Sequence, residues 1–186
     1  MAAPLLAQAP GEESARRIVA TLQLAAQEYR GAWQNGAMTA PSEWEEARLF
    51  VGEARRSAGE LPTSLRTSIT PLIETLAQRL DAKMPPDSLA LAASDIERRL
   101  TVAIGTSLEE RPAREPSVAN GELLFRSTCT RCHGMEGRGD GPVARAHQLT
   151  PPPADLGDAK LMAGTTPLDI YRKISFGVPG TRMQPF

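Results

Sequence analysis

The chain's two cysteines and one of its two histidines occur together at residues 129–133, in the order Cys-Thr-Arg-Cys-His. Such side chains can form a redox pair, hold zinc, make a disulfide or attach a haem. A thioredoxin-like redox pair needs alternating strands and helices, which this sequence lacks. A zinc site needs four ligands, and His147 has no partner at metal-binding spacing. A disulfide across two residues has poor geometry and constrains little chain.

The C-x-x-C-H spacing favours the remaining chemistry, covalent attachment of haem c. Two thiols add to the two vinyl groups on one haem edge, so their sulfurs must lie about one helical turn apart. Cys129 and Cys132 meet this condition. His133 then lies under the iron and can supply the proximal ligand. We therefore predict one covalent haem c.

A six-coordinate haem needs a second axial ligand on its opposite face. Met135 lies too close to His133 in sequence to reach that face, which leaves His147, Met162 and Met183. Met183 lies in a Pro- and Gly-containing segment that follows a predicted helix, and such a loop can close over the iron. A thioether ligand favours ferrous iron and raises the reduction potential. We expect Met183 to be the distal ligand, and His147 is the alternative that would give a bis-histidine haem.

The elements before this motif are predicted from hydrophobic periodicity. Apolar residues recur at helical spacing in four segments of residues 14–110, with short connections between them. This pattern predicts an antiparallel four-helix bundle. The expected boundaries are a capping box at Ser42 and Glu45, a kink or restart at Pro71 with Thr70 as cap, a cap at Asp87 or Ser88, and an end at Gly105.

A smaller domain is predicted to follow the bundle, and the whole chain is expected to be all-α. The bundle domain covers residues 14–110, a Pro-containing linker covers 111–116, and the haem domain covers 117–186. The haem domain begins with a short helix and continues through a Gly- and Pro-rich tract. Its last helix carries explicit signals, namely Thr166 as N-cap, Pro167 at the first position, Asp169 to complete a capping box, and Gly177 as the stop.

Residues 117–186 resemble a class I mono-haem cytochrome c in three separate blocks, GELLFRSTCTRCHGMEGRGDGP, LTPPPADL and PLDIYRKISFGVPGTRMQPF. The resemblance implies that His133 is the proximal ligand and Met183 the distal one. It also implies that a proline carbonyl accepts the imidazole N–H, and the run at 151–153 makes Pro152 and Pro153 the candidates. Gly137, Gly139 and Gly141 would form tight turns or lie close to the haem edge. The family's closing C-terminal helix is missing, so we expect a fragment.

The helical half is similar to the leader that precedes the haem in bacterial cytochrome c–iron permease fusion proteins. The similarity rests on EYRGAW, on the SEWEEA helix and on the order of the two domains. It implies that the haem accepts electrons from Fe(II), or relays them, as iron passes to a membrane permease domain beyond Phe186. The full-length protein would then be tethered to the membrane.

The bundle also contains oxygen ligands that suit iron, namely Glu28, Tyr29, Glu43, Glu45 and Glu46. A di-iron bundle needs Glu-x-x-His pairs, and neither histidine lies in this half, so that kind of site is excluded. The alternative interpretation of these residues is a solvated acidic helix face.

Composition and charge exclude further classes of function. The net charge is −1, and neither half is basic enough to indicate nucleic-acid binding. No run of about 18 apolar residues could span a membrane. No nucleophile–base pair is evident, which favours an electron carrier over an enzyme.

We expect a periplasmic protein, because APLLAQA near the start reads like the end of an export signal, with an unstructured terminus as the alternative. Two other functions remain open. The chain could be the electron-carrier subunit of a dehydrogenase or a terminal oxidase, with another protein as its redox partner. It could also be a haem-based ligand-binding or sensing module.

Overall fold

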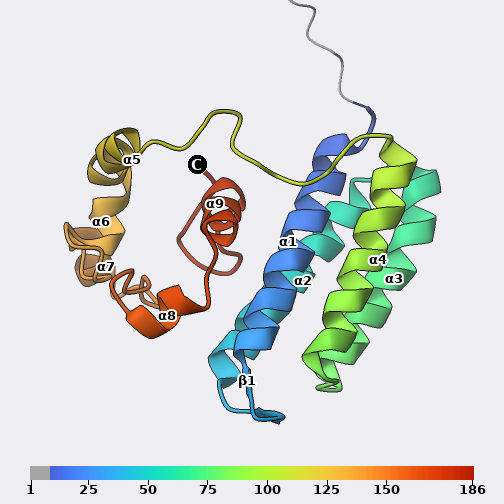
Figure 1. Ribbon diagram of the computed structural model, residues 1–186, viewed down its shortest axis with the longest axis horizontal. Helices are drawn as coiled ribbons and strands as arrows, with labels where there is room; N and C mark the ends of the chain where they lie inside the picture. Colours follow the sequence, from blue (N-terminus) through green and yellow to red (C-terminus); the bar gives the residue numbers. More distant parts are fainter. Residues whose placement is uncertain (1–8) are drawn as a thin grey trace, which may run out of the picture. The chain divides into compact units, whose positions relative to one another are not determined.

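The computed structural model describes residues 9–186, which divide into two compact units, one ending at Glu110 and one running from Arg111 to Phe186 (Figure 1). Apart from one short hairpin, every regular element in this range is helical, which confirms the all-α prediction. The segment that resembles an export signal lies almost entirely outside the described residues.

The first unit is a four-helix bundle, as predicted. Its helices are α1 (Glu12–Gly31), α2 (Pro41–Gly59), α3 (Thr63–Asp81) and α4 (Pro86–Ile104). Helix α1 packs against α2 and α4, and α3 completes the ring by packing against the same two helices. Each helix turns one stripe of apolar side chains inward, and the fully buried ones include Ile18, Leu24, Phe50, Ile73, Leu76 and Leu100. Burial of this stripe stabilises the bundle.

The connection between α1 and α2 contains a hairpin that the periodicity did not predict. Strands β1 (Trp33–Gln34) and β2 (Ala37–Met38) pair antiparallel. The residues between them, Asn35 and Gly36, both have a positive φ, 52° and 79°. An Asn-Gly pair is a strong hairpin signal because both residues tolerate this conformation. This pair is the feature of the sequence from which the hairpin could have been predicted.

The prolines explain why several expected helix boundaries in the bundle are wrong. Helices α2 and α4 begin at a proline, at Pro41 and Pro86, without any side-chain cap. Proline fits the first helical position because it has no N–H to satisfy there and its φ is already helical. The expected capping residues, Ser42, Glu45, Asp87 and Ser88, therefore lie inside their helices.

Helix α3 shows no restart at Pro71, one of the two outcomes expected there. It continues without interruption through Pro71, so Thr70 is not a cap. Burial of Ile69 and Ile73 on either side of the proline outweighs the one backbone hydrogen bond that proline removes. The expected end at Gly105 is confirmed, because this residue caps α4 in the left-handed conformation, with φ 82°.

Substitution of Tyr29 tests how much one hydrogen bond of a buried side chain stabilises the bundle. Its side chain is fully buried, and its hydroxyl donates a 2.6 Å hydrogen bond to the Met84 carbonyl. Tyr29→Phe should lower the free energy of unfolding by about 1 kcal/mol, because it removes a hydrogen bond whose donor lies on a buried side chain. Thermal unfolding followed by circular dichroism measures this loss. The matched control is Tyr171→Phe, whose hydroxyl makes an exposed bond of 3.4 Å; equal destabilisation by the two variants would contradict the prediction.

The second unit contains short helices joined by turns. They are α5 (Val118–Leu124), the π-helical turn η1 (Phe125–Cys129), α6 (Thr130–His133), α7 (Pro142–His147), α8 (Ala159–Ala163) and α9 (Pro167–Phe176). The signals predicted for α9 are confirmed. Thr166 and Asp169 exchange the two hydrogen bonds of a capping box, Pro167 is the first residue, and Gly177 ends the helix.

Candidate functional site

Cys129 and Cys132 lie where a π-helical turn passes into α6. The chain is helical from α5 through η1 to His133, and Gly134 then ends the helix with a φ of 78°. Both cysteines are free thiols and are half-buried. The widened turn holds Cys129 at the end of η1, one turn before His133, and such π-helical turns occur frequently at functional sites.

The electrostatics of Cys129 argue against a redox-active dithiol. Burial, and then the neighbouring Cys132, raise the pKa of the Cys129 thiol above its ordinary value. Reactive thiols of the thioredoxin kind depend on a lowered pKa, because the thiolate is the nucleophile. The raised pKa of the Cys129 thiol therefore does not favour a redox-active dithiol at this site.

His133 is oriented by a backbone carbonyl. Its Nδ1 lies 3.2 Å from the carbonyl oxygen of Ala154. With the proton on Nδ1, this nitrogen donates the hydrogen bond, and Nε2 keeps its lone pair for a metal. The acceptor is one residue beyond Pro153, so this bond involves neither Pro152 nor Pro153, the candidates from the family resemblance.

The glycine tract after the motif holds this carbonyl in place. The amide of Gly139 donates to the His133 carbonyl at 2.8 Å, and the amide of Gly141 donates to the Cys132 carbonyl at 3.0 Å. A Cβ on Gly139 would lie 2.2 Å from the Pro153 carbonyl oxygen, and the residue has a φ of 74°. Glycine is therefore required where the chain before Ala154 passes the motif.

Met183 lies in the loop after α9 and is half-buried. Backbone and hydroxyl hydrogen bonds fix the residue on both sides of its Cα, through Val178 and Thr181. Of the other candidates, His147 is exposed at the end of α7, whereas Met162 is half-buried on α8. Met135, which lies too close to His133 in sequence, is 66% exposed. The assignment of Met183 as the distal ligand stays a prediction.

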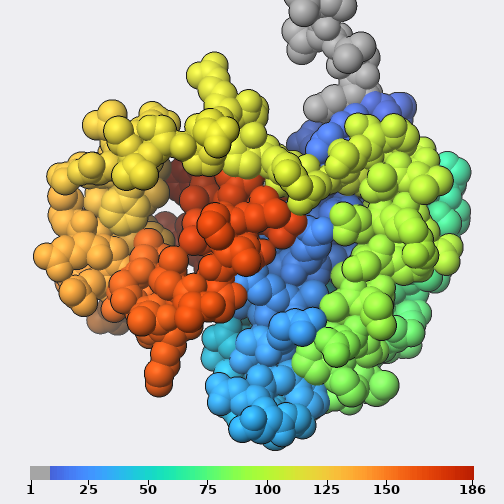
Figure 2. Space-filling view, in the orientation of Figure 1, coloured from blue at the N-terminus to red at the C-terminus, as the bar shows by residue number. Residues whose placement is uncertain are grey.

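The second unit fits a haem because it has almost no apolar core of its own. Among residues 111–186, Ala144 is the single buried hydrophobic residue, whereas the bundle's core is extensive. Large apolar side chains of this unit are exposed, among them Leu124, Leu156, Leu161 and Ile174. Figure 2 shows an opening in the surface between the α5–α6 region (yellow) and α9 (red). A large apolar cofactor would supply the missing burial, and Cys129, Cys132 and His133 would hold it.

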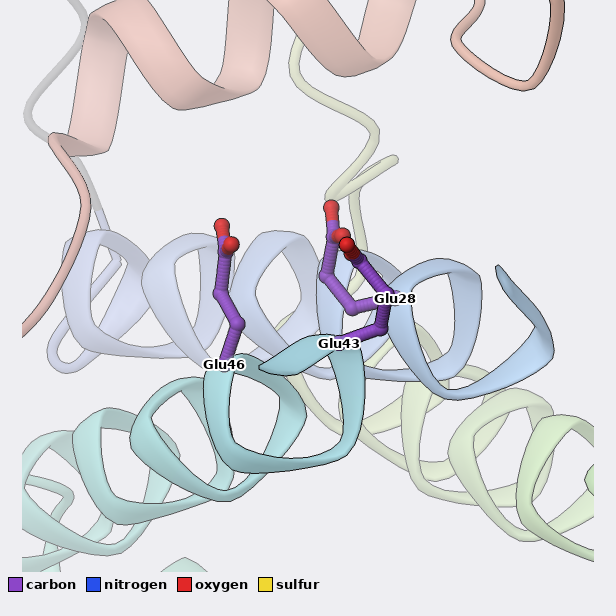
Figure 3. A group of neighbouring side chains, drawn as sticks. All are labelled: Glu28, Glu43 and Glu46. Atoms are coloured by element: carbon purple, nitrogen blue, oxygen red, sulfur yellow. The ribbon is translucent and has the colours of Figure 1, made fainter. Parts of the chain in front are cut away.

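The bundle carries a group of three carboxylates. Glu28 on α1 and Glu43 and Glu46 on α2 extend on the same side of these helices (Figure 3). Each offers an oxygen atom within 4.8 Å of the other two, and Glu28 is buried. Carboxylates this close are typical ligands of hard cations, but acidic groups also gather on helix surfaces without a metal ion. The geometry alone assigns no iron site here.

The two other oxygen ligands considered in the bundle lie apart from this group. Glu45 forms an ion pair with Arg48, at 3.3 Å, and borders a groove between α2 and α3. The Tyr29 hydroxyl is directed to the Met84 carbonyl, and burial raises its pKa. A tyrosinate ligand is therefore disfavoured.

The fold and the haem-binding motif together define a class of protein, a c-type cytochrome domain preceded by a helical bundle. Comparison with family models agrees. Residues 8–109 match the iron permease-associated 4-helix bundle domain, and residues 118–186 match the cytochrome c family. The chain belongs to the iron permease-associated bundle family and carries a cytochrome c domain after the bundle.

The other comparisons add no relative, since neither the curated proteins nor the solved structures gave a significant match. Within residues 9–186, no helix is both long and apolar enough to cross a membrane. The family matches link the chain to iron uptake through an associated permease, and they support haem as its cofactor.

Proposed function

We propose that this protein is a periplasmic electron carrier that accepts electrons from Fe(II), or relays them, while iron is delivered to a membrane permease. The observation that carries the proposal is the orientation of His133 by the Ala154 carbonyl beside two thiols at haem-attachment spacing. The domain that precedes this site belongs to an iron permease-associated family. Haem c attachment requires export, which supports a periplasmic location.

The protein's own residues would bind and tune the cofactor. Cys129 and Cys132 would anchor it covalently, His133 would ligate the iron through Nε2, and Met183 would supply the distal thioether. The Ala154 carbonyl strengthens His133 as a metal ligand by accepting a hydrogen bond from its Nδ1–H group. A bound haem would supply one-electron redox chemistry, so each electron taken from Fe(II) would leave one Fe(III) and would have to pass on to a protein acceptor.

The first experiment is reduction of the ferric holoprotein by Fe(II). Protein matured in the periplasm is mixed anaerobically with Fe(II), and the ferrous c-type absorption bands are followed against time. One reducing equivalent per haem is expected. Ascorbate serves as the control reductant, because a haem that ascorbate reduces and Fe(II) does not would exclude the iron-coupled role and favour a dehydrogenase or oxidase partner.

Met183→Ala tests the distal ligand. The variant should lose the weak ferric absorption band that marks His/Met ligation. Its reduction potential should fall by a substantial part of the roughly 0.8 V range over which axial ligands tune haem proteins. Absorption spectra and a redox titration measure both effects. Met162→Ala and His147→Ala are the controls. Loss of the band in Met162→Ala, with retention in Met183→Ala, would reassign the ligand to Met162, whereas a wild-type protein without the band would favour His147.

A further inference from the structure

The loop that carries Met183 is organised around the hydroxyl of Thr181. This hydroxyl donates a 2.7 Å hydrogen bond to the Val178 carbonyl and accepts a 3.0 Å hydrogen bond from the Met183 amide. The Thr181 amide donates to the same Val178 carbonyl, at 3.2 Å. A single side chain therefore joins the residue after the α9 stop to the backbone of Met183.

The carbonyl side of Met183 is fixed as well. Its oxygen accepts a 3.0 Å hydrogen bond from the Val178 amide. It also lies against Gly177, where a Cβ would be 2.6 Å away. The Phe186 amide then bonds the Ile174 carbonyl at 3.0 Å and returns the chain to α9. The loop from Gly177 to Phe186 is therefore held mainly by hydrogen bonds between main-chain atoms. Thr181 contributes the side-chain hydrogen bonds among those described here.

We propose that Thr181 is a positioning residue that holds the Met183 loop in its ligand-presenting conformation. This inference rests on the proposed function, because it takes Met183 to be the distal ligand. The hydroxyl must act as donor and acceptor at once, so serine can replace it and valine cannot. Valine has the shape of threonine and leaves the Met183 amide without its acceptor.

We expect Thr181→Val to weaken the binding of Met183 to the haem iron. An external ligand such as imidazole binds the ferric haem only after Met183 has left, so its apparent affinity reports the fraction of open loop. Loss of the two hydroxyl hydrogen bonds in Thr181→Val should raise the imidazole affinity about tenfold. The ferric band of His/Met ligation should weaken in parallel, while Thr181→Ser should keep both properties near wild type.

Thr165→Val is the matched control. The Thr165 hydroxyl also donates to a backbone carbonyl, that of Leu161, at 2.8 Å, in the same domain but away from the Met183 loop. This control should leave imidazole affinity and the ferric band unchanged. The measurements use the full-length chain with its haem. If Thr181→Val does not mature, hydrogen exchange of the wild-type Met183 amide still tests the idea, because a hydroxyl-bonded amide should be protected.

The outcomes separate this inference from the proposed function. A wild-type protein without the ferric band, or one that keeps it in Met183→Ala, overturns the ligand assignment on which the inference depends. A wild-type protein with the band, joined to a Thr181→Val variant that behaves like Thr165→Val, overturns the role of Thr181 alone. An unprotected Met183 amide does the same.

Discussion

Gly141→Ala should prevent the haem domain from reaching its native structure and should reduce the yield of covalent haem several-fold. A Cβ at this position would lie 2.4 Å from the Arg131 carbonyl oxygen and 2.6 Å from the Cys132 carbonyl carbon. Overpacking costs about 1–3 kcal/mol even where side chains can rearrange. Here the obstacles are backbone atoms of the haem-binding helix, so the helix itself would have to move.

The second unit can tolerate little of this strain, because it buries so few apolar side chains. Haem content per protein, from the reduced absorption spectrum of periplasmically matured chain, measures the effect. Gly164→Ala is the control in the same domain, since its nearest obstacle is at 3.9 Å, an ordinary contact. Wild-type haem content in Gly141→Ala would show that the glycine tract does not support the motif.

The sequence predicts those parts of the haem site that depend only on residue types and their spacing along the chain. The two thiols and the adjacent imidazole are a local pattern, so Cys129, Cys132 and His133 could be named together. The carbonyl that orients the imidazole is a non-local choice, because any residue of the passing backbone can supply it. The glycines allow the segment to approach, and the resulting register places Ala154 rather than a proline at the ring.

The carboxylate group in the bundle shows the same limit. Glu43 and Glu46 are neighbours on one helix, so their proximity follows from the sequence spacing. Glu28 joins them only because α1 packs against α2, and the sequence does not specify the register between two helices. Glu45 has the same chemistry as its neighbours, yet it borders the groove between α2 and α3 and pairs with Arg48 of its own helix.

The fold was predicted best where periodicity and caps acted together. The Thr166–Asp169 box and the two terminating glycines, Gly105 and Gly177, were read correctly because each requires one residue type at one place. The caps of α2 and α4 were predicted at the wrong residues because two signals for a helix start lie side by side there. One is a polar side chain that can cap a helix, and the other is a proline that can occupy the first helical position. Proline at the first helical position prevailed at both helices.

Leu100→Ala should destabilise the bundle by about 2–5 kcal/mol, which is a large fraction of the stability of a small domain. Leu100 lies on α4 with its side chain 0% exposed. Its removal leaves a cavity that neighbouring helices can fill only partly, so lost burial and lost contacts both add to the cost. Thermal or denaturant unfolding of the full chain, followed by the far-ultraviolet circular dichroism of its helices, measures the change.

Leu91→Ala provides the control for this experiment on the same helix. Leu91 is 71% exposed, so the identical substitution should change the free energy of unfolding by no more than about 0.5 kcal/mol. The contrast tests the orientation of α4, because rotation of this helix would exchange the two effects. If the two variants lost similar stability, α4 would not present Leu100 to the core, and the four-helix packing that precedes the haem domain would need revision.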